Sequence, residues 1–332
     1  MKKLSVAIIY GGEGGEHEIS CASAKNILNS IDRTRLDPYP VLIDKAGIWR
    51  HTNYNGRRVH LAKANGKTVI RDRYGSTEID AAFPILHGDY GEDGRIQGAL
   101  DALGLPYVGC SVTAGAVAAD KILTKRIADS LGIPTVPSVS LTGTESLPEA
   151  REIAEAEIGY PMFIKPSGLG SSLGCSLVTE RDGFDDALSL ARECGARVLI
   201  EEYLDGAREV ECAYLKTRTR GEIFTDPGEI LKRGVYTYNA KYGDNSTVRL
   251  SVRAELDSST KARVKRYSKL LVDAIGIRQL SRIDFFLKNG ELYLNEINTM
   301  PGFTEGSLYP MMINACGITT PDLITELIGD AI

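Results

Sequence analysis

Short apolar runs alternate with amphipathic segments along the first third of the chain. Residues 4–10 form a mainly apolar run that stops at two glycines, and a run of this length with glycines at its end predicts a buried strand. A helical pattern follows at about residues 19–29, and further apolar runs cover residues 39–43 and 81–86. This alternation predicts parallel strands with helical crossovers, and therefore an α/β fold.

The remaining two thirds continue the mixed pattern. A helix capped near Ser111 or Thr113 is predicted to run to Leu131, where Gly132 and Pro134 end it. The patterns also predict strands at 162–165 and 198–202, a helix at 259–275, a hairpin at 279–297 and a terminal helix. We divide the chain into three domains, at residues 1–109, 110–202 and 203–332.

Composition narrows the class of protein. A length of 332 residues exceeds one typical domain, and the net charge of −5 gives no sign of nucleic-acid binding. The six cysteines are scattered without metal-ligand spacing, so neither zinc nor a disulfide framework is expected. The first apolar run is too short for a signal peptide, and no run approaches the ~20 residues of a membrane span. We expect a cytoplasmic protein with reduced thiols and no membrane partner.

The glycine-rich turn at residues 11–17 is the first candidate ligand site. A dinucleotide fingerprint would need glycine at position 17, where His17 stands, so a nicotinamide cofactor is not expected. A plain tight turn remains the alternative. Even so, the turn places Glu16 at the carboxyl end of a strand, where α/β sheets bind ligands.

A second glycine-rich segment covers residues 165–174. Its glycines and serines allow backbone N–H groups to approach an anion, and Lys165 offers a positive charge to phosphate. It is not a Walker loop, because no Gly-Lys-Ser/Thr follows, and a flexible hairpin would have a similar composition.

The predicted hairpin carries the sharpest signal. Arg282 and Asp284 lie two apart on one strand, as do Glu296 and Asn298 on the next, so each pair shares a face. Carboxylate and amide oxygens suit Mg²⁺. The alternative is a solvated polar face, which the flanking apolar residues disfavour because they indicate a half-buried hairpin.

The loop of this hairpin decides whether the carboxylates meet. A two-residue turn at Asn289-Gly290 would pair Asp284 with Asn295 and turn Glu296 to the opposite face. We therefore predict a three-residue loop, 288–290, with Gly290 at positive φ.

Together these segments resemble the ATP-grasp fold, and within it the D-alanine:D-alanine ligase family. The resemblance extends over nearly the whole chain. It rests on Glu16-His17, Leu86-His87-Gly88, residues 94–98, Asp120-Lys121, residues 165–174, Lys241-Tyr242, Arg282-Ile283-Asp284 and residues 295–304. It implies a three-domain fold with a Rossmann-like N-terminal (pre-ATP-grasp) domain, and an ATP-dependent ligase that joins two D-alanine molecules for peptidoglycan precursors.

The resemblance also implies a nucleotide and metal site. Lys121 and Lys165 would hold ATP phosphates, while the adenine would rest near Glu201, Glu202 and Leu204, with Glu209 at the ribose. Asp284, Glu296 and Asn298 would bind two Mg²⁺ ions, for which Mn²⁺ can substitute.

For the amino acid substrates, the family pattern implies that Glu16 binds the ammonium group of the first amino acid. Arg282 and the Gly302 backbone N–H would bind its carboxylate. His87 would line this first subsite, and Ser307 and Lys241 would take the second carboxylate. Glu16, Ser171 and Tyr242 match a hydrogen-bonded trio that closes residues 232–249 over the site, and this segment is expected to be less ordered without ligand. Leu308 stands where the family selects the second side chain, and its apolar character favours D-alanine.

One departure keeps alternatives open. The family pattern has Ser-His-Ser where this chain has Glu305-Gly306-Ser307. A D-alanine:D-serine ligase and a non-catalytic nucleotide-binding protein remain alternatives to the D-alanine:D-alanine ligase, and a homodimer is compatible with the resemblance.

Overall fold

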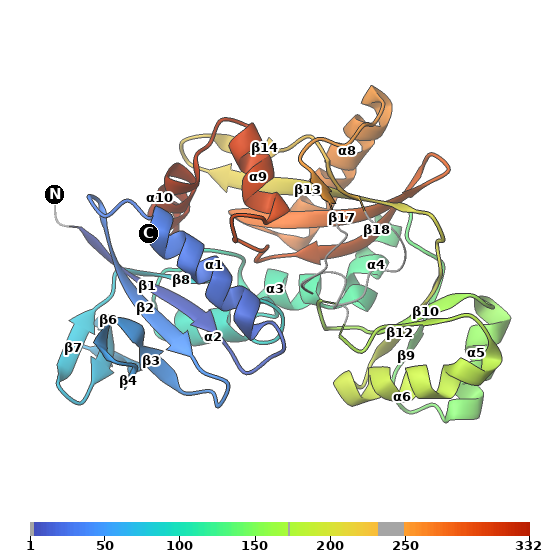
Figure 1. The fold of residues 1–332 in the computed structure, drawn as a ribbon, viewed down its shortest axis with the longest axis horizontal. Helices are drawn as coiled ribbons and strands as arrows, with labels where there is room; N and C mark the ends of the chain where they lie inside the picture. Colours follow the sequence, from blue (N-terminus) through green and yellow to red (C-terminus); the bar gives the residue numbers. More distant parts are fainter. Residues whose placement is uncertain (1–2, 172, 232–248) are drawn as a thin grey trace.

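The structure is a computed structural model that describes residues 3–171, 173–231 and 249–332. Its first sheet has the strand order β4-β3-β2-β1-β8 (Figure 1). The strands are β1 (Leu4–Gly11), β2 (Leu36–Ile43), β3 (Trp49–His51), β4 (Arg57–Arg58) and β8 (Ala81–Pro84). Strand β1 is parallel to β2 and β8, as the apolar runs predicted, and α1 (His17–Ser30) provides the crossover.

A small antiparallel sheet accompanies the first one and was not predicted. It consists of β5 (His60–Ala64), β6 (Lys67–Asp72) and β7 (Gly75–Glu78), preceded by a short 3-10 turn, η1 (Thr52–Tyr54). The strands β5 and β6 are joined by Asn65-Gly66, and both residues have positive φ, which suits a two-residue hairpin turn.

The second main sheet is antiparallel, with the order β11-β10-β12-β9. Its strands are β9 (Ser138–Leu141), β10 (Met162–Pro166), β11 (Ser176–Val178) and β12 (Val198–Glu202). Two helices, α5 (Leu147–Glu157) and α6 (Phe184–Cys194), pack on it, with η2 (Arg181–Gly183) leading into α6 (Figure 1). The glycine-rich segment therefore joins two paired strands, β10 and β11.

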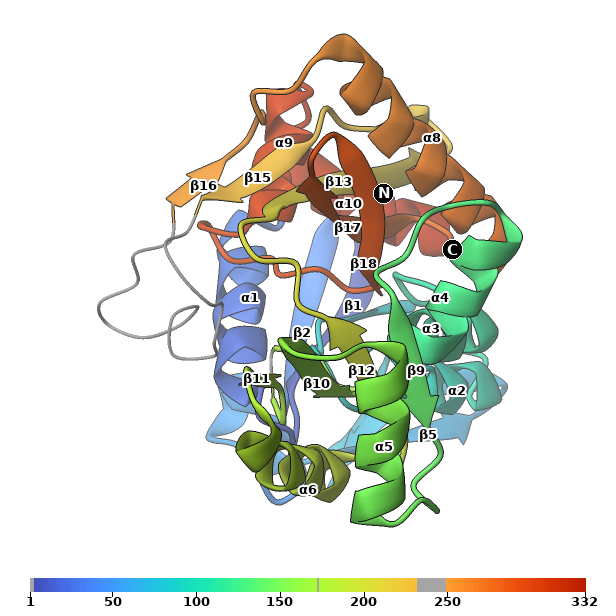
Figure 2. The same ribbon diagram turned by 90° about the vertical axis from the view of Figure 1, so that its right-hand side faces the viewer.

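The third main sheet is antiparallel and has the order β16-β15-β13-β17-β18, with β14 also beside β13. Its strands are β13 (Arg208–Thr217), β14 (Gly221–Phe224), β15 (Gly228–Leu231), β16 (Arg249–Ser251), β17 (Leu280–Lys288) and β18 (Glu291–Asn298). Helix α8 (Ser258–Ile275) packs on this sheet through a shared apolar core. Figure 2 shows the four-stranded sheet below the third sheet, with α4 (Lys121–Ser130) beside both.

The prediction of a single helix from Ser111 to Leu131 is wrong, because the helix is interrupted at Asp120. Two helices result, α3 (Val112–Ala119) and α4 (Lys121–Ser130), which follow α2 (Arg95–Ala102). Asp120 has an extended backbone, with φ −90° and ψ 104°, and its carboxylate accepts hydrogen bonds from the first N–H groups of α4. The predicted ends are confirmed, since Ser111 caps α3 and Leu131 follows α4.

The C-terminal helices α9 (Leu308–Ala315) and α10 (Thr320–Ala331) return to the first sheet. Their apolar residues share one core with Val6 and Ile8 of β1. Phe303, just before α9, packs edge-on against Phe83 of β8, with ring centroids 5.7 Å apart. The two ends of the chain are therefore held in one core. Within the described ranges, none of the helices has the length and apolar character that crossing a membrane requires.

Candidate active site

The β17–β18 hairpin brings the predicted metal-site residues together, though not by the predicted loop. Its turn contains two residues, Asn289 and Gly290, at φ 52° and 82°. The prediction of a three-residue loop is wrong, while the positive φ of Gly290 is confirmed.

A β-bulge explains how a two-residue turn still places Asp284 and Glu296 on the same face of the hairpin. Leu294 pairs with Phe285, and Glu296 pairs with Asp284, so Asn295 is an extra residue on its strand. The bulge keeps Leu294 in the apolar core and turns Glu296 to the polar face. Asp284 and Glu296 consequently share one face, as the metal-site prediction required.

Arg282 neutralises the carboxylates beside it. Its guanidinium donates hydrogen bonds of 2.8 and 2.7 Å to Asp284 and lies 3.0 Å from a carboxylate oxygen of Glu211 on β13. Burial opposes the charge, but these carboxylates outweigh it and hold the pKa of Arg282 above its usual value. Glu211 was missed in the sequence, and only the pairing of its strand with β17, opposite Asp284, identifies it.

The donor set fits Mg²⁺ that arrives with a nucleotide. Asp284 and Glu296 offer carboxylate oxygens, and Asn298, whose amide nitrogen donates to Asp284 at 2.9 Å, leaves its amide oxygen for a ligand. In the described part of the chain, no three His, Cys, Asp or Glu side chains form a ready-made metal cage. Magnesium is commonly held by one or two carboxylates together with substrate phosphates, and the two carboxylates found here suit such a set.

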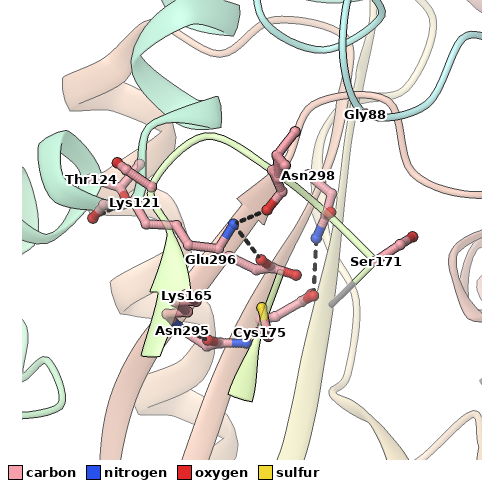
Figure 3. Close-up of polar contacts among 12 residues, drawn as sticks. Gly88, Lys121, Thr124, Lys165, Ser171, Cys175, Asn295, Glu296 and Asn298 are labelled. Carbon is pink, nitrogen blue, oxygen red and sulfur yellow. Dashed lines mark hydrogen bonds and ion pairs between the residues drawn. The ribbon is translucent and has the colours of Figure 1, made fainter. Parts of the chain in front are cut away.

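Lys121 lies at the N-terminus of α4 and faces this hairpin (Figure 3). Its ammonium is 3.2 Å from Glu296 and donates a 2.7 Å hydrogen bond to the carbonyl oxygen of Leu169 in the glycine-rich segment. Burial opposes the charge of Lys121, but Glu296 outweighs it and raises the pKa. Lys121 therefore stays protonated between the metal-site face and the glycine-rich segment.

A second cationic group lies on the four-stranded sheet. The ammonium of Lys165 is 2.5 Å from one oxygen of Glu201, and that of Lys125 is 2.6 Å from the other. All three side chains are buried, so two cations share one carboxylate and the group keeps a positive charge suited to phosphate. Lys125 was not among the predicted site residues, although its place one helical turn after Lys121 was a usable signal.

The other residues predicted to contact the nucleotide lie at the end of β12, at the start of β13 or on the connection between these strands. Glu202 ends β12, Leu204 follows in the connection, and Glu209 is the second residue of β13. Glu201 precedes Glu202 on β12, where it is paired with Phe163 of β10 and Ser138 of β9, and its side chain is engaged by two lysines.

Glu16 meets the glycine-rich segment from the other side. The Ser171 hydroxyl donates a hydrogen bond to the Glu16 carboxylate, and a Cβ at Gly88 would lie 2.1 Å from the same carboxylate. Gly88 also has φ 67°, so this position requires glycine. The predicted pairing of Glu16 with Ser171 is present, while Lys241 and Tyr242 lie outside the described residues.

Gly302 and Ser307 lie between β18 and α9, and Leu308 is the first residue of α9. The Gly302 N–H donates to no group among the described residues, and its Cα carries no side chain where Ser307 Oγ approaches. Ser307 Oγ accepts a 3.0 Å hydrogen bond from the backbone of Thr304. Leu308 is only 4% exposed and packs in the core, so its side chain presents little surface to a ligand.

His87 lies beside these groups and is buried. Its Nε2 is 3.0 Å from Ser23 Oγ, and its Nδ1 is 2.9 Å from the carbonyl oxygen of Met300. Both ring nitrogens are thus engaged within the protein. Glu92, which sequence reasoning missed, lies in the same cluster, where removal from water and the charge of Glu16 raise its pKa to about 8.

Comparisons with known proteins show the family of the chain. Residues 5–110 match the family model of the D-ala D-ala ligase N-terminus, and residues 127–329 match that of the D-ala D-ala ligase C-terminus. The chain belongs to the D-alanine–D-alanine ligase family. The resemblance and the α/β ATP-grasp fold predicted from the motifs are both confirmed.

Relatives of this family match over the full chain. The D-alanine–D-alanine ligase A of Mesorhizobium japonicum is 37% identical over 352 aligned positions, covering 100% of this chain and 98% of the relative. The crystal structure of D-alanyl-alanine synthetase A from Vibrio cholerae has a TM-score of 0.91 at 31% identity, covering 100% of this chain and 99% of that one. A D-Ala:D-Ser ligase from Enterococcus faecalis has a TM-score of 0.88 at 30% identity, with both chains fully covered.

Proposed function

We propose that this protein is an ATP-dependent ligase that joins two D-alanine molecules through an acyl phosphate, supplying a peptidoglycan precursor in the cytoplasm. The observation that carries the proposal is the shared face of Asp284 and Glu296, which the bulge at Asn295 creates next to Lys121. Relatives that carry the name D-alanine–D-alanine ligase over the whole chain support the same substrate class.

The nucleotide would lie between the second and third main sheets. Lys121 and Lys165 would be the phosphate-binding cations, with the adenine near Glu201, Glu202 and Leu204 and the ribose at Glu209. Asp284, Glu296 and Asn298 would hold two Mg²⁺ ions, or Mn²⁺ in their place. The metal would supply charge neutralisation as the γ-phosphoryl group is transferred.

The first D-alanine would place its ammonium on Glu16 and its carboxylate near Arg282 and the Gly302 N–H. One carboxylate oxygen takes the γ-phosphoryl group of ATP, giving an acyl phosphate and ADP. The amine of the second D-alanine then attacks the acyl carbon and loses a proton, and phosphate leaves from the tetrahedral intermediate. Arg282 and the Gly302 N–H would stabilise the oxyanion of that intermediate.

The second D-alanine would bind near Ser307, with Lys241 at its carboxylate and the small exposed part of Leu308 giving the space for its side chain an apolar character. Glu16, Ser171 and Tyr242 would act as the trio that closes the site against water. We retain the division into domains at residues 1–109, 110–202 and 203–332, and homodimer formation, as parts of this proposal.

Acceptor choice tests the proposal. Phosphate release is measured at saturating ATP and first-site D-alanine, with D-alanine, D-serine and D-lactate as acceptors. We expect D-alanine to have the highest kcat/KM, because a serine hydroxyl against an apolar pocket loses water contacts at a cost of ~1–3 kcal/mol. D-Lactate should be poorer still. A D-serine value equal to or above that of D-alanine would favour a D-alanine:D-serine ligase, and no release with any acceptor would indicate a nucleotide-binding protein without ligase activity.

A further inference from the structure

The segment that carries Gly302 is attached to the N-terminal part of the chain through its own backbone. We call residues 299–303 the Gly302 loop. Glu92 accepts a 3.2 Å hydrogen bond from the Met300 N–H with one carboxylate oxygen and a 3.2 Å hydrogen bond from the Gly88 N–H with the other. One carboxyl group thus joins the Gly302 loop to the glycine whose missing side chain makes room for Glu16.

Further side chains of the N-terminal part fix the same loop. Ser23 Oγ accepts a 3.1 Å hydrogen bond from the Phe303 N–H, and Asn26 donates a 2.7 Å hydrogen bond to the Phe303 carbonyl oxygen. His87 Nδ1 lies 2.9 Å from the Met300 carbonyl oxygen. Both Met300 and Phe303 are therefore held at the N–H and at the carbonyl group, and only residues 301 and 302 lie between them.

Packing and covalent geometry make these attachments restrictive. Met300 and Phe303 are at most 1% exposed and belong to the core shared with β1 and β8. Pro301 fixes its own φ near −65°, so few backbone torsions remain between the two anchored residues. The Gly302 N–H, which donates to no described group, consequently has a defined direction.

We propose that Glu92 is a positioning residue that aims the Gly302 N–H at the reacting carboxyl group by holding Met300 and Gly88 together. The inference rests on the proposed function for its catalytic consequence. A hydrogen-bond donor to an oxyanion acts only where the oxygen develops its charge, and loss of one such donor costs ~10²–10³-fold in kcat. A misplacement of about 1 Å has an effect of a similar order.

Glu92→Gln tests the attachment with almost no change in volume. Its amide keeps one acceptor oxygen but presents an NH₂ group to the second backbone N–H, so one of the two hydrogen bonds is lost. We expect kcat to fall ~10- to 100-fold while KM for ATP changes less than ~2-fold, since Lys121 and Lys165 are untouched. Amide hydrogen exchange of the Gly302 loop, measured without substrate, should become ~10-fold faster.

Two further variants separate positioning from general destabilisation. Gln97→Met removes a buried 2.7 Å hydrogen bond to the Gly91 carbonyl oxygen, in the segment that carries Glu92, without touching the Gly302 loop. It should lower thermal stability and leave kcat within ~2-fold of the wild type. Asn26→Ala, at a half-buried position, should speed exchange at Phe303 and lower kcat less than Glu92→Gln does.

The outcomes are distinguishable from those of the acceptor assay. Wild-type kcat in Glu92→Gln, or unchanged exchange in the Gly302 loop, would overturn the proposal. An equal loss of kcat in Gln97→Met would assign the effect to stability and overturn it as well. If the wild type released no phosphate with D-alanine, the proposed function would be wrong, and the exchange measurement would still decide whether Glu92 positions the loop.

Discussion

At the scale of single residues, the carboxylates on the metal-site face and at the phosphate-binding lysines each have a cationic neighbour. Glu296 is matched by Lys121, Asp284 by Arg282, and Glu201 by two lysines. Removing one member of a buried ion pair lowers the stability of the fold by more than the pair itself contributes, because the remaining charge is left buried without a partner. A bound metal and phosphates would therefore replace interactions that already exist in the site.

Gly88 offers a residue-scale test of the role of Glu16. Gly88→Ala places a Cβ 2.1 Å from the Glu16 carboxylate and forces alanine to φ 67°. We expect KM for D-alanine at the first site to rise at least ~10-fold, because the carboxylate must move away from its bond with Ser171. Steady-state kinetics with varied D-alanine provide the measurement.

The control for Gly88→Ala is Gly66→Ala in the β5–β6 turn. Gly66 has a similar φ, 78°, and open space around it, so this variant carries the backbone strain alone, about 1 kcal/mol. Its melting temperature should fall while the kinetics stay unchanged. Equal KM values in the two alanine variants would contradict the placement of Glu16 at the first ammonium.

At the scale of elements, regular periodicity was predictable and its interruptions were not. Strands β1, β2 and β8 of the first sheet, helix α8 and the β17–β18 hairpin follow from apolar patterns and turn residues, whereas the short strands β3 and β4 were not predicted. The break at Asp120 and the bulge at Asn295 each depend on one residue whose effect is decided by packing: an aspartate that caps α4, and an asparagine outside the ladder. Glu92 and Lys125 were missed for the same reason, since their partners lie far away in the sequence.

The bulge makes a prediction about deletion. In a bulge two residues span the distance of one, so deletion of Asn295 leaves Glu296 opposite Asp284 in a regular hairpin and does not shift the residues that follow. We expect the deletion variant to fold and to retain Mg²⁺-dependent phosphate release within ~10-fold of the wild type. Magnesium titrations of the initial rate are the measurement.

Asn295→Ala is the matched control for the deletion. It keeps the bulge but removes the 3.4 Å contact between Lys165 and the Asn295 side chain. If alanine and deletion give the same rate, the side chain accounts for any loss. If the deletion variant lost its Mg²⁺-dependent phosphate release while Asn295→Ala kept it, the deletion would have turned Glu296 to the other face. That result would contradict the strand register described above.

At the scale of the whole molecule, the site forms where segments far apart in the sequence converge. Glu16 comes from the turn between β1 and α1, Lys165 from the second main sheet and Asp284 from the third, while the C-terminal helices pack in the core of the first sheet. The motifs in the sequence predicted which residues would meet, because they match a known family. They did not predict the contacts between Glu92 and the Gly302 loop, which arise only when the first and last parts of the chain are packed together.

Glu92 should couple this packing to pH. Its pKa is raised to about 8 by removal from water and by Glu16, against an ordinary value of 4.5. Between these two values the folded protein holds a proton on Glu92 that the unfolded chain releases, so the free energy of unfolding decreases as pH rises through that window. This decrease in the free energy of unfolding should amount to a few kcal/mol. Glu92→Gln should abolish the part of the pH dependence that comes from Glu92. Denaturant midpoints of both proteins from pH 4.5 to 9 provide the measurement. The free energy of unfolding of the wild type, relative to that of the variant, should fall steadily up to about pH 8 and then level off. Parallel curves for the two proteins would mean that Glu92 has an ordinary pKa and is open to water.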